Sequence, residues 1–275
     1  LAYRVCMMAP PSFGGVVVLQ VLQMLEARPA PAQPGDRFNF DQSDFVHYFA
    51  QAGRLAQADR IQHVGDPGYA QVPSEALVAR DYVRSRALLI DPARAVAEPP
   101  PGMPLRSGTP VAQTEEAVEP ADATSQMAIV DRDGNALSMT TTINLNFGSR
   151  LMAQGMVLNN ALTNFSAPPR PGQAGPNRME AGKRPVTSMA PTIVFDAQGR
   201  PVVVGGSAGG GQIVDYIGQS LVEMLANGRT PAQALALSGF DCRNAISCSG
   251  SQVALFLVPP YRPGCAPGTC CPPAE

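Results

Sequence analysis

Histidine is almost absent from this sequence, since only His47 and His63 occur among its 275 residues. A Ser-His-Asp triad would have to use one of them, and each is more typical of a helix surface or a core position. A zinc site meets the same shortage of ligands. The sequence therefore predicts no metal and no other cofactor, and any catalysis has to proceed with little or no histidine.

Strong net charge and long apolar segments are also lacking. The chain has 20 Lys and Arg against 22 Asp and Glu, a formal net charge of -2, so no basic surface is expected for nucleic acid or anionic lipid. The longest apolar segment, around 16–25, contains Gln20 and Gln23 and is too short to cross a bilayer. We expect one sizeable core, no nucleic-acid partner and no membrane span.

Cysteine is scarce until the last part of the chain. Cys6 stands alone, and the others lie in a Pro- and Gly-rich tail: Cys242, Cys248, Cys265, Cys270 and Cys271. That tail has neither paired CxxC spacing nor a nearby histidine. We predict an atypical segment over 241–275, either a foreign or frame-shifted ending or a divergent natural one. The start at Leu1, without Met, predicts that an N-terminal part of the natural protein is missing.

Apolar residues at helical spacing dominate the first ninety residues. Three segments show this period and predict helices, namely 13–27, 41–60 and 72–90, with Ser43 and Ser74 as the N-caps of the second and third. The first helix should bury one face, formed by Val16, Leu19, Leu22 and Leu25. The stretch 91–122 has no period and much proline, which predicts a loop.

The period changes to two after Thr124. Segments 125–131 and 135–144 flank an Asp-Gly step at Asp133-Gly134, which predicts a β-hairpin. Further elements are predicted in chain order: strands at 155–158, 191–195 and 201–204, a loop at 167–182, a helix over 211–228 that stops at Gly228, and another helix from Thr230-Pro231. Helices, then an antiparallel sheet, then helices again predict a layered α+β sandwich.

Thr124 is a candidate nucleophile that would not need a histidine as its base. A threonine at a chain terminus can use its own α-amine, with an ordinary pKa of about 7.7 to 8.0, to accept the hydroxyl proton near neutral pH. Cleavage of the Ala123–Thr124 bond would free that amine. The alternative interpretation is that Thr124 is only a β-branched residue entering a strand.

A glycine-rich segment, GGSAGGGQ at 205–212, opens the predicted helix over 211–228. Gly209 and Gly210 could point backbone N–H groups at a developing oxyanion. Glycines at a helix N-terminus also cradle phosphate. However, the segment lacks the Lys-Ser/Thr of a P-loop and a convincing G-x-G-x-x-G followed by a distant acidic residue. We favour the oxyanion site over nucleotide binding.

Six ordered blocks between Tyr3 and Leu237 resemble the γ-glutamyltranspeptidase family of N-terminal-nucleophile hydrolases. They are MAPPSFGG, QADRIQHVGDPGY, TSQMAIVDRDGNALSMTTTINLNFGS, GMVLNNALTNFS, GKRPVTSMAPTIVFD and GGSAGGGQI. The resemblance implies a four-layer αββα sandwich, here incomplete, and autocatalytic cleavage before Thr124. It divides the chain into 1–123, the end of a large subunit, and 124–240, the start of a small catalytic subunit.

The same resemblance implies a role for each polar residue of the site. The roles are nucleophile (Thr124), assistance in self-cleavage and activation (Thr142), binding of the γ-glutamyl group (Asn144), binding of the donor's α-carboxylate (Thr187, Ser188) and the oxyanion site (Gly209, Gly210). The implied partners are a small γ-glutamyl donor and an amino-acid, peptide or water acceptor. Relatives of this kind imply a periplasmic or secreted protein.

Two positions depart from the family pattern. Ala161 and Asn164 stand where the family usually carries Gln or Glu and an Asp, and that Asp pairs with the donor's α-ammonium. A neutral Asn loses the charge-assisted part, about 1.5 to 3 kcal/mol. Transfer or hydrolysis of γ-glutamyl groups through an acyl-threonine is therefore the first hypothesis, a glutaryl-amide or cephalosporin acylase the second, and an inactive truncated homologue the third. The Asn164-Phe165-Ser166 sequon is interpreted as incidental.

Overall fold

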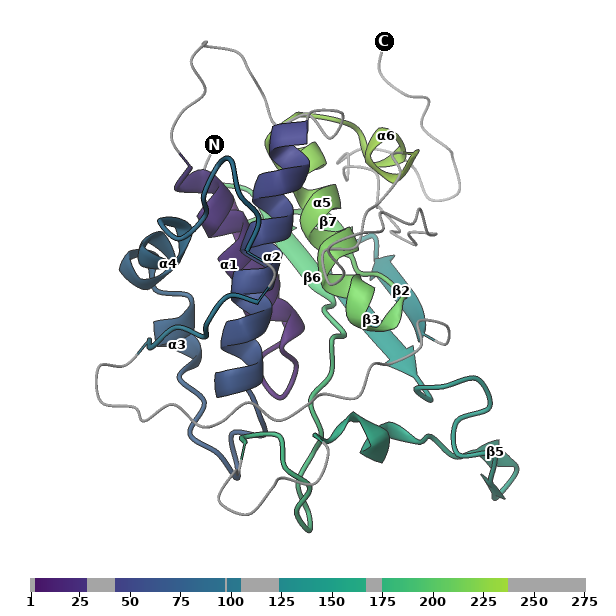
Figure 1. Ribbon diagram of the computed structural model, residues 1–275. Coiled ribbons are helices and arrows are strands. Elements are labelled where there is room, and N and C mark those ends of the chain that lie inside the picture. Colours follow the sequence, from purple (N-terminus) through teal and green to yellow (C-terminus); the bar gives the residue numbers. More distant parts are fainter. Residues whose placement is uncertain (1–2, 29–42, 97, 105–123, 167–174, 237–275) are drawn as a thin grey trace.

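The computed structural model describes residues 3–28, 43–96, 98–104, 124–166 and 175–236 (Figure 1). The helices of these residues are α1 (Gly14–Glu26), α2 (Ser43–His63), α3 (Ser74–Leu77), α4 (Arg80–Ala87), α5 (Ile213–Leu225) and α6 (Pro231–Ala236), with 3-10 turns η1 (Ala161–Asn164) and η2 (Gly210–Gln212). The strands are β1 (Arg4–Met7), β2 (Thr124–Val130), β3 (Ala136–Thr142), β4 (Met152–Ala153), β5 (Met156–Val157), β6 (Thr192–Phe195) and β7 (Pro201–Gly205). This inventory confirms the predicted α+β class.

The strands form three antiparallel sheets within the described residues, with the orders β1-β6-β7, β2-β3 and β4-β5. In the first sheet β6 is central, since Thr192 is opposite Met7 on one side and Gly205 on the other. Helices α1, α2 and α5 lie together beside this sheet, and the β2-β3 hairpin lies at its β7 side (Figure 1). The predicted strands at 191–195 and 201–204 are confirmed as β6 and β7.

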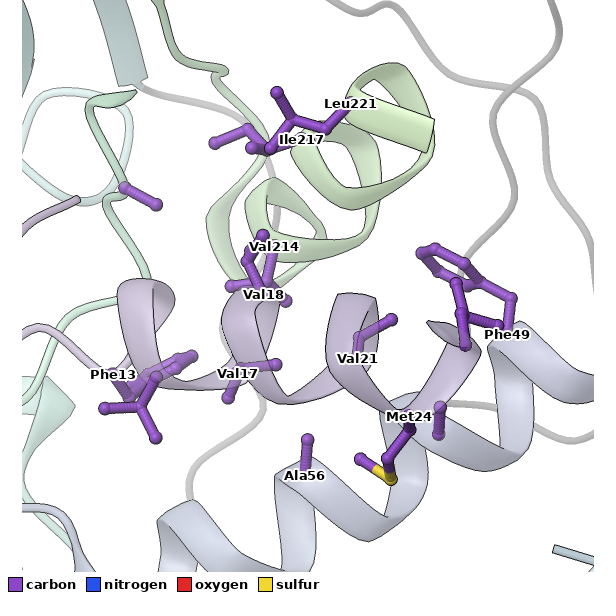
Figure 2. Close-up of a cluster of buried hydrophobic side chains, with 14 of the residues drawn as sticks. Phe13, Val17, Val18, Val21, Met24, Phe49, Ala56, Val214, Ile217 and Leu221 are labelled. Atoms are coloured by element: carbon purple, nitrogen blue, oxygen red, sulfur yellow. The ribbon is translucent and has the colours of Figure 1, made fainter. Parts of the chain in front are cut away.

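Helix α1 lies at the centre of the core because it packs against both α2 and α5. In Figure 2, Val18 of α1 lies next to Val214 of α5. One buried cluster contains Val17, Val18, Val21 and Met24 of α1, Phe49 and Ala56 of α2, and Val214, Ile217 and Leu221 of α5. The prediction that α1 buries one face formed by Val16, Leu19, Leu22 and Leu25 was wrong in part, because Leu19 and Leu22 are only half-buried. A helix with neighbours on two sides buries more than one face.

The predicted single helix over 72–90 is divided into α3 and α4. Ala79 is extended, with φ -64° and ψ 132°, so the chain changes direction between them. The side-chain amides of Gln20 and Gln23 of α1 donate to the carbonyl oxygens of Leu77 at 2.8 Å and Val78 at 3.1 Å. These bonds satisfy backbone acceptors that the break leaves without helical partners.

Of the predicted helix ends, the start of α6 is confirmed, whereas the N-cap of α3 and the end of α5 differ from the prediction. Pro73, not Ser74, occupies the N-cap position of α3, and Ser74 is the first helical residue. The C-cap of α5 is Ala226, so the predicted stop at Gly228 is two residues too late. The predicted start of α6 is confirmed, since Thr230 Oγ1 accepts the N–H of Gln233 at 3.3 Å. The side chain of Ser43 lies outside the described residues.

Other predictions also fall outside the described residues. These are the atypical tail over 241–275, residue Ala123 and most of the predicted loop at 91–122. Within the described part of the chain, no helix is long and apolar enough to cross a bilayer. In the same part, no group of three or more His, Cys, Asp and Glu side chains is arranged to hold a metal ion.

Candidate active site

The β2-β3 hairpin places Thr124 directly opposite Thr142. Its turn forms as predicted from the Asp-Gly step, because Gly134 adopts φ 87° and the Asp131 carboxylate accepts backbone N–H groups, among them that of Asn135 at 2.9 Å. These hydrogen bonds, with that of the Asn135 side chain foremost, lower the pKa of the Asp131 carboxyl. A locally determined turn therefore sets the register that pairs the two threonines.

The chain turns sharply after Thr142. Asn144 has φ 77°, a left-handed conformation that Asn tolerates better than most residues. Its backbone N–H donates to Thr142 Oγ1 at 2.9 Å, and its side-chain amide donates to Thr163 Oγ1 at 3.1 Å. The turn thus brings together the two hairpin residues predicted for the site and connects them with the η1 turn.

Asn164 ends η1 and faces the segment that carries the predicted carboxylate-binding residues. Its Nδ2 lies 3.5 Å from the carbonyl oxygen of Val186, and its own carbonyl oxygen accepts a bond from Asn177 Nδ2 at 2.8 Å. Asn177 Oδ1 in turn accepts the N–H of Val186 at 3.1 Å. Asn164 Oδ1 is buried and has no hydrogen-bond donor among the described residues. Such a buried acceptor can take a hydrogen bond from a water or from a bound ligand.

Thr187 and Ser188 are held by the first block of the sequence. Thr187 forms a parallel bridge with Ser12, and its carbonyl oxygen accepts the N–H of Phe13 at 2.9 Å. A Cβ atom on Gly14 would lie 2.5 Å from the carbonyl oxygen of Ser188, so only glycine permits this approach of α1. Ser188 is buried, and its Oγ donates to the carbonyl oxygen of Gly210 at 2.7 Å.

The glycine segment forms the turn that begins α5. Gly209 has φ 123° and Gly210 has φ 54°, conformations for which glycine is strongly favoured. A side chain on Gly209 would also meet the Tyr216 ring at 3.0 Å. Within the described residues, the backbone N–H groups of these two glycines donate no hydrogen bond. Backbone N–H groups at the start of a helix are suited to stabilise an oxyanion.

Hydrogen bonds connect several of these segments. The hairpin is joined to the start of the glycine segment because Ser138 Oγ donates to the carbonyl oxygen of Gly205 at 2.6 Å. The structure therefore brings some of the predicted residues together: Thr142 lies opposite Thr124 and bonds to Asn144, and Ser188 bonds to Gly210. Asn164 contacts Val186, the residue before Thr187.

Sequence reasoning missed the ion pair between Asp66 and Arg184. The Asp66 carboxylate, 3% exposed, accepts Arg184 Nη2 at 2.8 Å, Arg184 Nε at 3.1 Å and the Arg184 backbone N–H at 2.9 Å. Both residues lie in blocks of the family resemblance, but neither block shows which charges meet. The pair joins residues on opposite sides of the predicted cleavage position.

This ion pair predicts a pH dependence of stability. Hydrogen bonds from the Arg184 side chain, followed by its backbone N–H, hold the pKa of Asp66 well below its usual range. A carboxyl with a lowered folded pKa stabilises the fold above its unfolded pKa, about 3.9, and this stabilisation is lost as the pH falls below that value. We expect Arg184→Gln to lower the urea midpoint near pH 6, and the difference from wild type to shrink near pH 3.

The matched control is Arg178→Gln, which removes an exposed pair with Glu180. It should change the urea midpoint little at either pH. A midpoint for Arg184→Gln equal to that of wild type near pH 6 would show that the Asp66 pair does not stabilise the fold.

Comparisons with known proteins give matches along most of the chain. The Gamma-glutamyltranspeptidase family model matches residues 1–247. The chain is 34% identical to the glutathione hydrolase proenzyme of Bacillus subtilis (strain 168) over 231 residues, which are 80% of this chain and 37% of that protein. It is 31% identical to the Acylase ACY 1 proenzyme of Pseudomonas sp. (strain SE83) over 225 residues, 81% of this chain and 36% of that protein.

A solved structure shows the same fold. The crystal structure of cephalosporin acylase from Bacillus halodurans superimposes with a TM-score of 0.69 at 24% identity, over 86% of this chain and 38% of that chain. At this identity the likeness concerns the fold alone, and it confirms the predicted layered α+β fold. The chain spans less than two fifths of the length of each of these three proteins.

Proposed function

The chain belongs to the γ-glutamyltranspeptidase family, and from this premise we propose that it carries the nucleophile and oxyanion site of an enzyme that transfers or hydrolyses γ-glutamyl groups. The observation that carries the proposal is the register of the hairpin, which pairs Thr124 with Thr142. The activity, its substrates and the division into 1–123 and 124–240 all belong to this proposal. So does export to the periplasm or the medium.

Self-cleavage begins with the Thr124 hydroxyl. Thr124 Oγ attacks the carbonyl carbon of Ala123, the peptide C–N bond breaks and an ester forms at Oγ while the nitrogen becomes the α-amine of Thr124. Water then hydrolyses the ester, which restores the hydroxyl and leaves a carboxylate on Ala123. In the mature site the amine accepts the hydroxyl proton, which makes Thr124 a nucleophile without histidine.

Acyl transfer follows from the same groups. Thr124 Oγ attacks the γ-carbonyl of the donor, and the N–H groups of Gly209 and Gly210 stabilise the oxyanion. The leaving amine takes up a proton as the C–N bond breaks, and an acyl-threonine remains. Water or an acceptor amine then attacks that ester and releases the γ-glutamyl product.

The hydrogen bonds of the hydroxyl groups in the proposed site indicate which of these groups can donate to a substrate. Thr142 Oγ1 accepts the N–H of Asn144, and Thr187 Oγ1 accepts the N–H of Met189 at 3.2 Å. Thr187 Oγ1 keeps a proton of its own and can donate it to the donor's carboxylate. Thr142 lies opposite Thr124, and in the proposed site it assists self-cleavage and activation. The Ser188 hydroxyl donates to the carbonyl oxygen of Gly210 and so holds the oxyanion turn in place. In the proposed site, the donor's carboxylate would compete with Gly210 for this hydrogen bond.

Asn164 decides between γ-glutamyl and glutaryl donors. Its unpaired buried Oδ1 suits the ammonium of a γ-glutamyl donor, but a neutral amide binds it less strongly than a carboxylate does. This difference favours a second candidate function, hydrolysis of glutaryl amides, for which the amine is not needed. The similarity to an acylase proenzyme agrees with that alternative.

We expect Asn164→Asp to raise kcat/KM for γ-glutamyl-p-nitroanilide relative to glutaryl-p-nitroanilide by about tenfold, the ratio that corresponds to ~1.4 kcal/mol and lies near the lower end for a charge-assisted hydrogen bond. The measurement is the rate of p-nitroaniline release with each donor. Asn159→Asp is the control, because Asn159 is exposed and its Oδ1 already accepts the N–H of Ala161. An equal change in both variants would contradict the assignment of Asn164, and equal turnover of both donors by wild type would defeat either exclusive function.

A further inference from the structure

Gln126 lies two residues after the nucleophile position and on the same face of β2 as Thr124, because side chains alternate along a strand. It is buried, and both ends of its amide are used. Oε1 accepts the hydroxyl of Thr140 at 2.5 Å, while Nε2 donates to Ser138 Oγ at 3.0 Å and to the carbonyl oxygen of Met127 at 2.9 Å. Gln126 therefore connects β2 with the inward face of β3.

The hydroxyl of Ser138 continues this connection into the neighbouring sheet. It donates its single proton to the carbonyl oxygen of Gly205 at 2.6 Å and accepts the backbone N–H of Thr192 at 3.2 Å. Together with the bond from Gln126, these contacts use the proton and both lone pairs of the hydroxyl. Its orientation is thereby fixed, and with it the position of the end of β7 relative to the hairpin.

Gly206 packs directly against the amide of Gln126. A Cβ atom on Gly206 would lie 2.3 Å from Oε1 and 2.6 Å from Cδ of Gln126, so the backbone approaches this side chain as closely as glycine allows. Gly206 begins the segment that leads to Gly209 and Gly210. The same side chain therefore contacts the strand of the nucleophile and the start of the oxyanion turn.

We propose that Gln126 is a positioning residue that sets the distance between the Thr124 hydroxyl and the backbone donors of Gly209 and Gly210. The proposal rests on the function proposed above. Catalysis through an oxyanion site requires the nucleophile and the donors to be placed together, and a shift of about 1 Å costs on the order of 100-fold in rate. Gln126 acts through Ser138 and Gly206 and does not touch the substrate.

Two substitutions test this role. Gln126→Met keeps the length of the side chain and removes both hydrogen-bonding ends, while Thr140→Val removes only the donor to Gln126 Oε1. Thr141→Val is the matched control, because Thr141 is the next residue of β3, is exposed, and lies on the opposite face. All three are compared with wild type in the full 275-residue chain.

The first readout is kcat per active site for γ-glutamyl-p-nitroanilide, with sites counted from the burst of p-nitroaniline. We expect kcat per site to fall roughly 10- to 100-fold in Gln126→Met, and less in Thr140→Val, with KM little changed and Thr141→Val like wild type. A merely structural role would lower the number of active sites and leave kcat per site unchanged, which would overturn the proposal.

The second readout needs no catalysis. Hydrogen–deuterium exchange of the peptide covering 205–212 should accelerate in Gln126→Met and Thr140→Val but not in Thr141→Val. Unchanged exchange in both inward variants would overturn the coupling between hairpin and glycine segment. Absence of cleavage at Thr124 in wild type, with the exchange result as expected, would instead reject the proposed function and leave the coupling supported.

Discussion

A chain carrying Thr124→Ala is expected to remain one uncut polypeptide and to release no product from a γ-glutamyl donor above background. The substitution removes the oxygen that attacks both the Ala123 carbonyl and the donor. Removal of a catalytic nucleophile typically costs on the order of 10⁴-fold or more in kcat. Denaturing gel electrophoresis for the cleavage, and p-nitroaniline release for the activity, measure the two losses separately.

Two neighbouring substitutions show whether the effect belongs to the Thr124 hydroxyl. Thr124→Ser retains a hydroxyl and should still cleave, although at a changed rate. Ser125→Ala removes the adjacent hydroxyl, which is exposed on the other face of β2, and should cleave like wild type. Normal cleavage by Thr124→Ala, or a block in Ser125→Ala, would contradict the assignment of the nucleophile.

The second large effect is expected on stability, from Asp59→Ala. Asp59 is fully buried in α2 and pairs with Arg86 Nη2 at 2.9 Å. Its carboxylate also accepts bonds from the Tyr82 hydroxyl at 2.7 Å, the Gly102 N–H at 2.7 Å and Gln20 Nε2 at 3.2 Å. Burial, and then the charge of Asp59, raise the pKa of Tyr82, so this side chain remains a hydroxyl donor.

Removing one partner of a buried pair leaves the other charge uncompensated, and we expect Asp59→Ala to lower the free energy of unfolding by about 3 to 5 kcal/mol. Urea denaturation measures this loss. Asp44→Ala is the control, because Asp44 is exposed in the first turn of the same helix and should cost less than about 1 kcal/mol. Equal losses in the two variants would show that the buried cluster does not stabilise the fold.

The local parts of the fold could be predicted from the sequence. The hairpin follows from an Asp-Gly step between two alternating segments, and both signals lie within twenty residues of each other. The division of 72–90 into two helices could not be predicted in this way. At the break, the carbonyl oxygens of Leu77 and Val78 accept hydrogen bonds from Gln20 and Gln23, which lie on a different helix and far away in the sequence.

The candidate site was also predictable only in part. Its residues are predicted by resemblance to family blocks, and the structure shows how distant blocks meet, for example Ser12 with Thr187 and Ser188 with Gly210. The partners of charged residues were not predictable, because Asp66 is one acidic residue among 22 and Arg184 one basic residue among 20. The sequence did not indicate a role for Gln126, because the role of a glutamine in a strand depends on which groups its amide contacts.

Self-cleavage tests the central claim most directly. The purified chain is incubated near neutral pH and examined by intact mass measurement and N-terminal sequencing. The account predicts two polypeptides, one ending at Ala123 and one beginning Thr124-Ser125-Gln126-Met127. A folded chain that remains uncut, or a new terminus at any other residue, would contradict the claim that Thr124 is the nucleophile of this protein.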